Sequence, residues 1–182
     1  YRLNPYTAGL FGNCHFSGRH AAYRLPSGRV KLERWVETHG QPKVYIVMDR
    51  VDAPEPVTAQ VNWQFATTAV EHLAANALVV GPPGEPRAIV VFAELPEQQV
   101  QVEDSVISRV YGSKEEAKRL RLTRRGQKLL FVTVIRALKP DAPLDDLPQI
   151  TLYKEKDGTD WIDVLEGEFG YGLSVPVERS LN

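Results

Sequence analysis

Hydrophobic and polar residues alternate most regularly over Val57–Phe65. The apolar positions are Val57, Ala59, Val61, Trp63 and Phe65, and the polar positions between them are Thr58, Gln60, Asn62 and Gln64. Side chains in a strand point to opposite faces in turn, so this period predicts a half-buried β-strand with its apolar face toward the core.

The wider stretch from Arg29 to Ala66 contains three strand-like runs separated by two turn-like segments. The first separator is Thr38–Lys43 and the second is Ala-Pro-Glu-Pro at 53–56. Pro and Gly are frequent in turns because they fit turn dihedral angles that other residues disfavour. The pattern therefore predicts three neighbouring antiparallel strands.

Further strands are predicted along the rest of the chain. Arg87–Glu94 and Lys128–Leu138 are continuous apolar runs, typical of strands buried on both faces. Two short strands are expected within Thr67–Val80 in place of a helix, and a turn at Arg124–Gln127. About a dozen short strands with little helix indicate an all-β protein, a two-sheet antiparallel β-sandwich.

Composition narrows the class of protein without identifying it. The 182 residues are expected to form a single β-sandwich domain over 1–182, with 1–19 an irregular lead-in from an upstream domain, and the chain begins with Tyr1. The net charge of −1 gives no overall field that would attract nucleic acid. Cys14 is the only cysteine, which excludes an internal disulfide and a multi-cysteine metal site. No apolar run is long enough for a membrane helix.

One candidate cluster lies near the N-terminus. His or Tyr could remove a proton beside a carboxylate, while Asn or Arg neutralises the acid group. The residues are Asn13, His15, Arg19, His20 and Tyr23. Their spacing matches no known catalytic motif, so the alternative is a set of ordinary polar residues on a strand and its loop.

A second candidate is the basic run Lys118–Arg125. As a strand it places Arg119 and Arg121 on one face and leucines on the other. Guanidinium groups bind carboxylates and sulfates through paired hydrogen bonds, so this face could bind an anionic polymer. The alternative is a solvated strand face whose charge is balanced by Glu115 and Glu116.

Tryptophans and acidic loops supply the remaining candidates. Trp35 has the parity of Lys31 and Glu33, so among the three tryptophans it is the best candidate for an exposed ring that contacts a sugar, whereas Trp63 is expected in the core. Two acidic segments leave a bound calcium ion open as an alternative to solvated loops, and no other cofactor is expected. These segments contain Asp141, Asp145 and Asp146, and the turn Asp157–Asp160.

Several short motifs resemble the C-terminal β-sandwich of the heparinase II/III-like polysaccharide lyases. The order of elements matches over roughly Ala21 to Leu138. The matching motifs are Arg34-Trp-Val, Tyr45-Ile-Val-Met-Asp-Arg-Val-Asp, Val61-Asn-Trp-Gln-Phe, Val110-Tyr-Gly-Ser-Lys and Phe131-Val-Thr-Val-Ile.

The resemblance implies a multi-domain lyase in which an upstream (α/α) toroid carries the machinery for β-elimination of uronic-acid polysaccharides. The family's sandwich histidine, in a His-Asn pair, has no match here, since Asn13-Cys-His15 is a different motif. No catalytic residue or metal ligand is therefore assigned, and the chain alone is expected not to be catalytic. A periplasmic or secreted location is implied.

Two other functions stay open at this point. The chain could be a stand-alone module that binds an anionic polysaccharide, with substrate contacts drawn from His15, Arg19, His20, Tyr23, Trp35, Arg119 and Arg121. It could instead be a structural interaction domain without a ligand, which a large apolar patch over Tyr1–Phe16 would favour.

Overall fold

The structure is a computed structural model that describes residues 14–20, 24–39, 44–144, 146–154, 160–166 and 169–175. At 14–20, 24, 39, 154, 160, 166, 169 and 173–175 it describes the backbone alone. Asn13, Tyr23, Asp145, Asp157 and the first 13 residues lie outside the described part.

All described strands pair in antiparallel sheets. The eight-stranded sheet has the order β1 (Cys14–His20), β4 (Lys31–His39), β5 (Val44–Gln64), β10 (Glu115–Leu138), β8 (Arg87–Phe92), β7 (Ala77–Val80) and β6 (Val70–Ala74), with β9 (Gln99–Ile107) also paired to β10. The three-stranded sheet has the order β11 (Gln149–Lys154), β12 (Asp160–Glu166) and β13 (Phe169–Val175). A two-stranded ladder joins β2 (Arg24–Leu25) and β3 (Gly28–Arg29).

These sheets confirm the predicted all-β sandwich. The described residues contain no helix, and hence none long and apolar enough to cross a membrane. The two short strands expected within Thr67–Val80 are β6 and β7. Of the lead-in expected over 1–19, residues 14–19 belong to β1, which pairs with β4 along its whole length.

The prediction of short strands was wrong for β5 and β10. A turn was predicted at 53–56, which lies within β5, and another at 124–127, which lies within β10. β5 and β10 pair with each other on both sides of these positions. The register shifts between Gly126 and Lys128, whose partners on β5 are Val57 and Asp52. A bulge, and not a pair of turns, therefore occupies this place.

Proline explains why the bulge falls where it does. Pro54 and Pro56 have no backbone N–H, so they fit a segment that has left the regular ladder. On the opposite strand the side chain of Gln127 donates a hydrogen bond to the carbonyl of Pro54 at 3.1 Å. Arg124 donates to the carbonyl of Leu130 at 2.9 Å, which joins the two halves of β10 across the bend.

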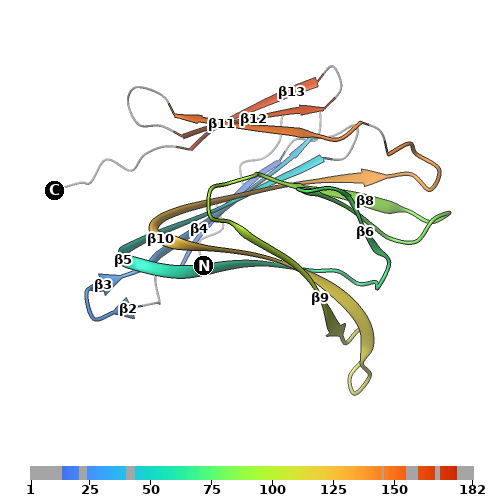
Figure 1. Cartoon of the computed structure of the whole chain (residues 1–182), viewed down its shortest axis with the longest axis horizontal. Coiled ribbons are helices and arrows are strands. Elements are labelled where there is room, and N and C mark those ends of the chain that lie inside the picture. Colours follow the sequence, from blue (N-terminus) through green and yellow to red (C-terminus); the bar gives the residue numbers. More distant parts are fainter. Residues whose placement is uncertain are drawn as a thin grey trace.

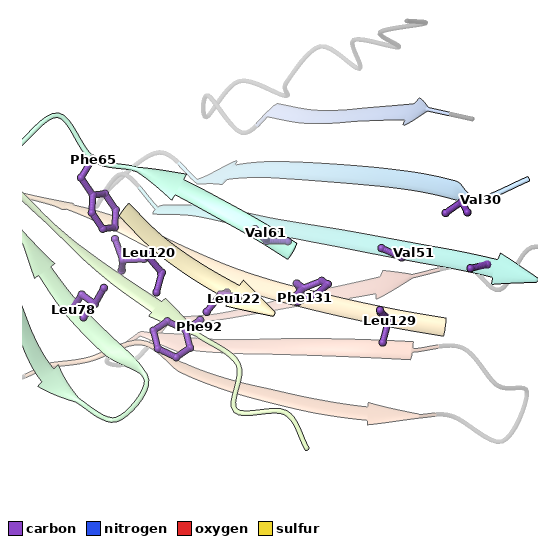
Figure 2. Packing of buried hydrophobic residues seen from close by; sticks show 12 residues of the cluster. Val30, Val51, Val61, Phe65, Leu78, Phe92, Leu120, Leu122, Leu129 and Phe131 are labelled. Carbon is purple, nitrogen blue, oxygen red and sulfur yellow. The ribbon is translucent and has the colours of Figure 1, made fainter. Parts of the chain in front are cut away.

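The bend folds the eight-stranded sheet over one of its own faces. Figure 1 shows the two halves of β10 as separate layers, with β9 beside the N-terminal half. The first core cluster joins both layers, because Val61, Leu120 and Leu122 pack in the same cluster as Leu129 and Phe131 (Figure 2). Removing these side chains from water stabilises the bent form by about 1.5–3 kcal/mol for each fully buried one.

A second core cluster fills the space between the eight-stranded sheet and the three-stranded sheet. It contains Ile46, Met48 and Val134 from the large sheet and Ile162 and Val164 from β12. Figure 1 shows β11, β12 and β13 together as a layer above the large sheet. Strands near the middle are covered on both faces, as their continuous apolar runs predicted.

Candidate functional site

The bend creates a three-stranded arm with one polar face. The arm consists of residues 57–64 of β5, 115–126 of β10, and β9. Its inner side chains, such as Leu120 and Leu122, are buried in the first core cluster. The opposite side, here called the outer face, contains the polar residues Thr58, Gln60, Asn62, Gln64, Gln99, Gln101, Glu103, Ser105, Glu115, Arg119, Arg121, Thr123 and Arg125, together with Ile107 and the buried Ala117.

Glu103 is the centre of the charged part of the outer face. Its Oε1 accepts hydrogen bonds from Nε of Arg119 at 2.7 Å and from Nη2 of Arg121 at 2.7 Å, and it also contacts Nη2 of Arg119. Glu103 lies opposite Arg119 in the β9–β10 register, which brings a single carboxylate between the two guanidinium groups. All three side chains are between a quarter and a third exposed.

The carboxylates that balance the basic run differ from those expected. Glu115 pairs with Arg109 at 3.3 Å, and Lys118 pairs with Asp104 at 2.6 Å. The negative charge that balances the basic run therefore comes from Glu103 and Asp104 on the neighbouring strand, and not from Glu115 and Glu116 as predicted. Sequence proximity misled here because partners across a sheet can be far apart in the chain.

A different arginine arrangement lies on the part of the sheet that faces the inner side of the arm. Arg34 of β4 donates from Nε to Oδ1 of Asp49 at 2.5 Å and from Nη2 to Oδ2 at 2.8 Å, and the two residues are register partners in β4 and β5. This hydrogen-bonded carboxylate raises the pKa of the Arg34 guanidinium, so its charge persists at every ordinary pH.

Trp63 joins this ion pair to the arm. The guanidinium carbon of Arg34 lies 5.5 Å from the centre of the Trp63 ring, which is within range for a cation–π interaction. The indole Nε1 of Trp63 donates to Oγ1 of Thr133 at 3.1 Å. Arg34, Asp49, Trp63 and Thr133, here called the interlayer cluster, thus connect the arm to the sheet on which it folds.

Trp63 and the strand around it lie as the sequence predicted. The apolar positions of Val57–Phe65 all belong to the first core cluster or pack against it, and the four polar positions are exposed. Trp35, in contrast, is half-buried and packs against the second core cluster. The three-stranded sheet covers that face of β4, so the parity of Trp35 with Lys31 did not place its ring in open solvent.

The predicted substrate-binding residues do not form one group. Arg119 and Arg121 lie on the outer face, while Trp35 packs on the far side of the central sheet. In β1, His15, Arg19 and His20 are register partners of Glu37, Glu33 and Leu32. His15 and Arg19 have the same parity along β1 and His20 has the other. A substrate-binding role for these residues, and for Tyr23 outside the described part, stays a prediction.

The calcium alternative falls largely outside the described residues, because Asp145 and the 155–159 turn are not among them. Asp146 lies 3.9 Å from Arg136. Within the described ranges, no group of His, Cys, Asp and Glu side chains could hold a metal ion.

The hairpin between β9 and β10 shows why one of the short motifs contains glycine. Gly112 has a φ of 82°, a conformation that other residues rarely adopt. The backbone N–H of Ser113 donates to the carbonyl of Val110 at 3.0 Å, which closes the turn. Tyr111 at the tip is fully exposed.

Comparison with known proteins gives a match only at the level of structure. No protein-family model and no curated protein matches the sequence. The heparan sulfate lyase HepC of Pedobacter heparinus superposes with a TM-score of 0.72 at 15% identity, over 96% of this chain and 28% of that chain. A crystal structure of heparinase III superposes with a TM-score of 0.75 at 11% identity, over 96% of this chain and 27% of that chain.

The chain has the fold of a heparinase-like domain. This confirms the fold that the motifs had suggested. This chain spans a little over a quarter of the length of the proteins it resembles. Two of the quoted motifs meet in space, since Arg34 from the first binds Asp49 from the second.

Glu103 is the outer-face residue that the interpretation of the sequence missed. Its signal was present, because the alternation of Val100, Val102 and their polar neighbours places Glu103 on the polar face of a strand. The local pattern does not reveal which strand lies beside β9. Only the β9–β10 register brings Glu103 to Arg119, 16 positions away.

Proposed function

We propose that this chain is a supporting domain of a polysaccharide lyase, which acts with a separate catalytic domain to cleave an anionic uronic-acid polysaccharide by β-elimination. The observation that carries the proposal is the superposition on heparan sulfate lyase and heparinase III structures over more than nine-tenths of this chain. The catalytic groups are assigned to an upstream (α/α) toroid in the same protein.

The arrangement of charged residues supports a supporting role over a catalytic one. β-Elimination requires a base positioned to remove the proton beside the uronate carboxylate and a group that neutralises that carboxylate. The carboxylate of Asp49 is bound to Arg34, and the carboxylate of Glu103 is bound to Arg119 and Arg121. Both carboxylates therefore take part in ion pairs. These groups hold strands together and leave the chemistry to another domain.

The test is to express the full open reading frame that contains this chain, beside the 182 residues alone. Heparan sulfate, hyaluronan and alginate are added in turn, and the ultraviolet absorbance of the unsaturated uronate product is followed. We expect turnover of at least one polysaccharide by the full product and none by the 182 residues. Turnover by the short chain would contradict the supporting role, and no turnover by either would contradict the lyase assignment.

A further inference from the structure

The outer face is mostly polar, and no described strand pairs with either outer edge of the arm. Its polar side chains alternate with buried ones along three strands, so they project in rows about 4.8 Å apart. The outer edge of β9 and the outer edge of residues 57–64 of β5 have no strand partner among the described residues. A long, extended ligand could therefore lie across the arm without displacing a paired strand.

The charge on this face is positive although the protein as a whole is slightly negative. The face contains Arg119, Arg121 and Arg125 against the carboxylates of Glu103 and Glu115, and Glu115 also pairs with Arg109 of the adjoining hairpin. One oxygen of Glu103 accepts hydrogen bonds from both arginines, and this holds their guanidinium groups side by side. Each guanidinium group has further N–H donors that do not bind Glu103. Such a pair is already ordered for a carboxylate or sulfate oxygen.

Amide side chains surround the arginine pair. Gln60 and Asn62 lie on β5 beside Thr123 and Arg121, and Gln101 lies across from Arg121 on β9. All three amides are exposed. An amide offers both a donor and an acceptor, which is what a sugar hydroxyl requires, whereas a protein partner would favour an apolar centre with few such groups.

We infer that the outer face is a binding site for an extended anionic polysaccharide, in which Arg119, Arg121 and Arg125 bind carboxylate or sulfate groups and the amides bind hydroxyls. The inference rests on the proposed function for its ligand class and adds the place on the domain where the chain is held. Charge complementarity selects the anionic sugar over a neutral one.

The experiment measures binding of the 182-residue chain to heparan sulfate and alginate oligosaccharides by calorimetry at low salt. The Arg119→Gln/Arg121→Gln double variant is expected to bind about tenfold more weakly, and the affinity of the parent chain should fall as salt is added. Binding of the variant equal to that of the parent chain would overturn the inference. The two glycans separate a preference for sulfate from one for carboxylate.

A charge-matched control removes two cations away from the outer face. Arg29 and Lys139 are exposed and lie outside the arm, so an Arg29→Ala/Lys139→Ala variant should bind both glycans as the parent does. An equal loss of affinity in this control would mean that overall charge alone drives binding, which contradicts a specific site.

Two further variants keep the inference testable if the arginine variant does not fold. Gln60→Ala/Asn62→Ala changes only exposed side chains and should weaken binding about threefold. Glu103→Gln removes a competing negative charge but keeps an oxygen that accepts from the two arginines, so it should strengthen binding about threefold at low salt. Unchanged binding in both variants would overturn the site.

Non-sugar and neutral probes define the ligand class. Neutral dextran of matched length should bind much more weakly than either anionic glycan, and a single-stranded DNA of matched charge should not replace them. Equal binding of the DNA would show that the outer face binds polyanions in general and is not a sugar site. If the full product cleaves a uronate polysaccharide while the outer-face variants bind as the parent does, this inference fails and the proposed function stands.

Discussion

Two arginine–carboxylate arrangements, one facing the inner side of the arm and one on its outer face, have different roles. In the interlayer cluster, Arg34 binds Asp49 and contacts Trp63, so it connects the arm to the sheet beneath. On the outer face, Glu103 binds Arg119 and Arg121, and every contact stays within two neighbouring strands. The same residue types therefore stabilise the fold in one place and leave a positive surface open in the other.

The difference follows from what each ion pair faces. Asp49 is mostly covered, with 17% of its side chain exposed, while Arg34 is 49% exposed and the ring above it belongs to another layer. The outer-face residues project from a strand whose opposite side is already buried in the first core cluster. An ion pair that joins two layers is sensitive to their packing, whereas the outer-face pairs, with side chains 26–34% exposed, join only neighbouring strands and respond to salt.

The largest effect is expected from Trp63→Ala. The change removes the ring that contacts Arg34 and packs on the first core cluster, and it leaves the hydroxyl of Thr133 without its indole donor. We expect the free energy of unfolding in urea to fall by about 3 kcal/mol. Trp63→Phe keeps most of the packing and should lose about 1 kcal/mol. Equal, small losses in both would show that the interlayer cluster does not hold the arm.

The bend itself can be tested through Gly126→Ala. A Cβ atom at this position would lie 2.8 Å from Cδ2 of Leu129, which is buried in the first core cluster and has little room to move. We expect a loss of about 2 kcal/mol in the free energy of unfolding. Gly112→Ala at the hairpin tip meets no atom within 4 Å but has a strained φ, and it should lose only about 1 kcal/mol. The reverse order would contradict the packing of the bend.

Asp49→Asn should have an intermediate effect. The charge-assisted pair with Arg34 becomes neutral while the shape is kept, so about 1 kcal/mol of stability should be lost by urea unfolding. Asp104→Asn is the matched control, because its carboxylate is 93% exposed although it also pairs with a cation. A loss at Asp104 as large as at Asp49 would remove the distinction between covered and surface ion pairs.

The smallest effect on stability is expected at the outer face. Arg121→Gln should change the free energy of unfolding by no more than about 0.5 kcal/mol, because its pair with Glu103 is partly exposed and screened. The same variant should bind heparan sulfate oligosaccharides more weakly in calorimetry. A large loss of stability with unchanged glycan binding would assign this pair to the fold.

Local pattern revealed the strands and their buried faces but not how the strands are arranged. The alternation around Trp63 placed its ring correctly on the core side. The prolines at 54 and 56 indicate an interruption, but a turn and a bulge both accept proline, and only pairing with β10 on both sides distinguishes them. The sequence therefore predicted a hairpin where the structure has a bend.

The candidate sites were less predictable than the fold because they depend on contacts between distant strands. Arg119 and Arg121 were correctly placed on one face of a strand, yet the identity of Glu103 as their partner required the β9–β10 register. Trp35 was predicted to be exposed, but it packs against the second core cluster. The parity of a residue along its strand does not reveal that a second sheet covers that face.

The most direct measurement is an amide and side-chain NMR titration of the 182-residue chain with a heparan sulfate oligosaccharide. We expect chemical-shift changes over β9, residues 115–125 of β10 and residues 58–64 of β5, with the guanidinium signals of Arg119 and Arg121 among the largest. The indole signal of Trp63 and the Nε signal of Arg34 should stay in place. Shifts centred on Trp63 and Arg34, or no shift on the outer face, would contradict the account.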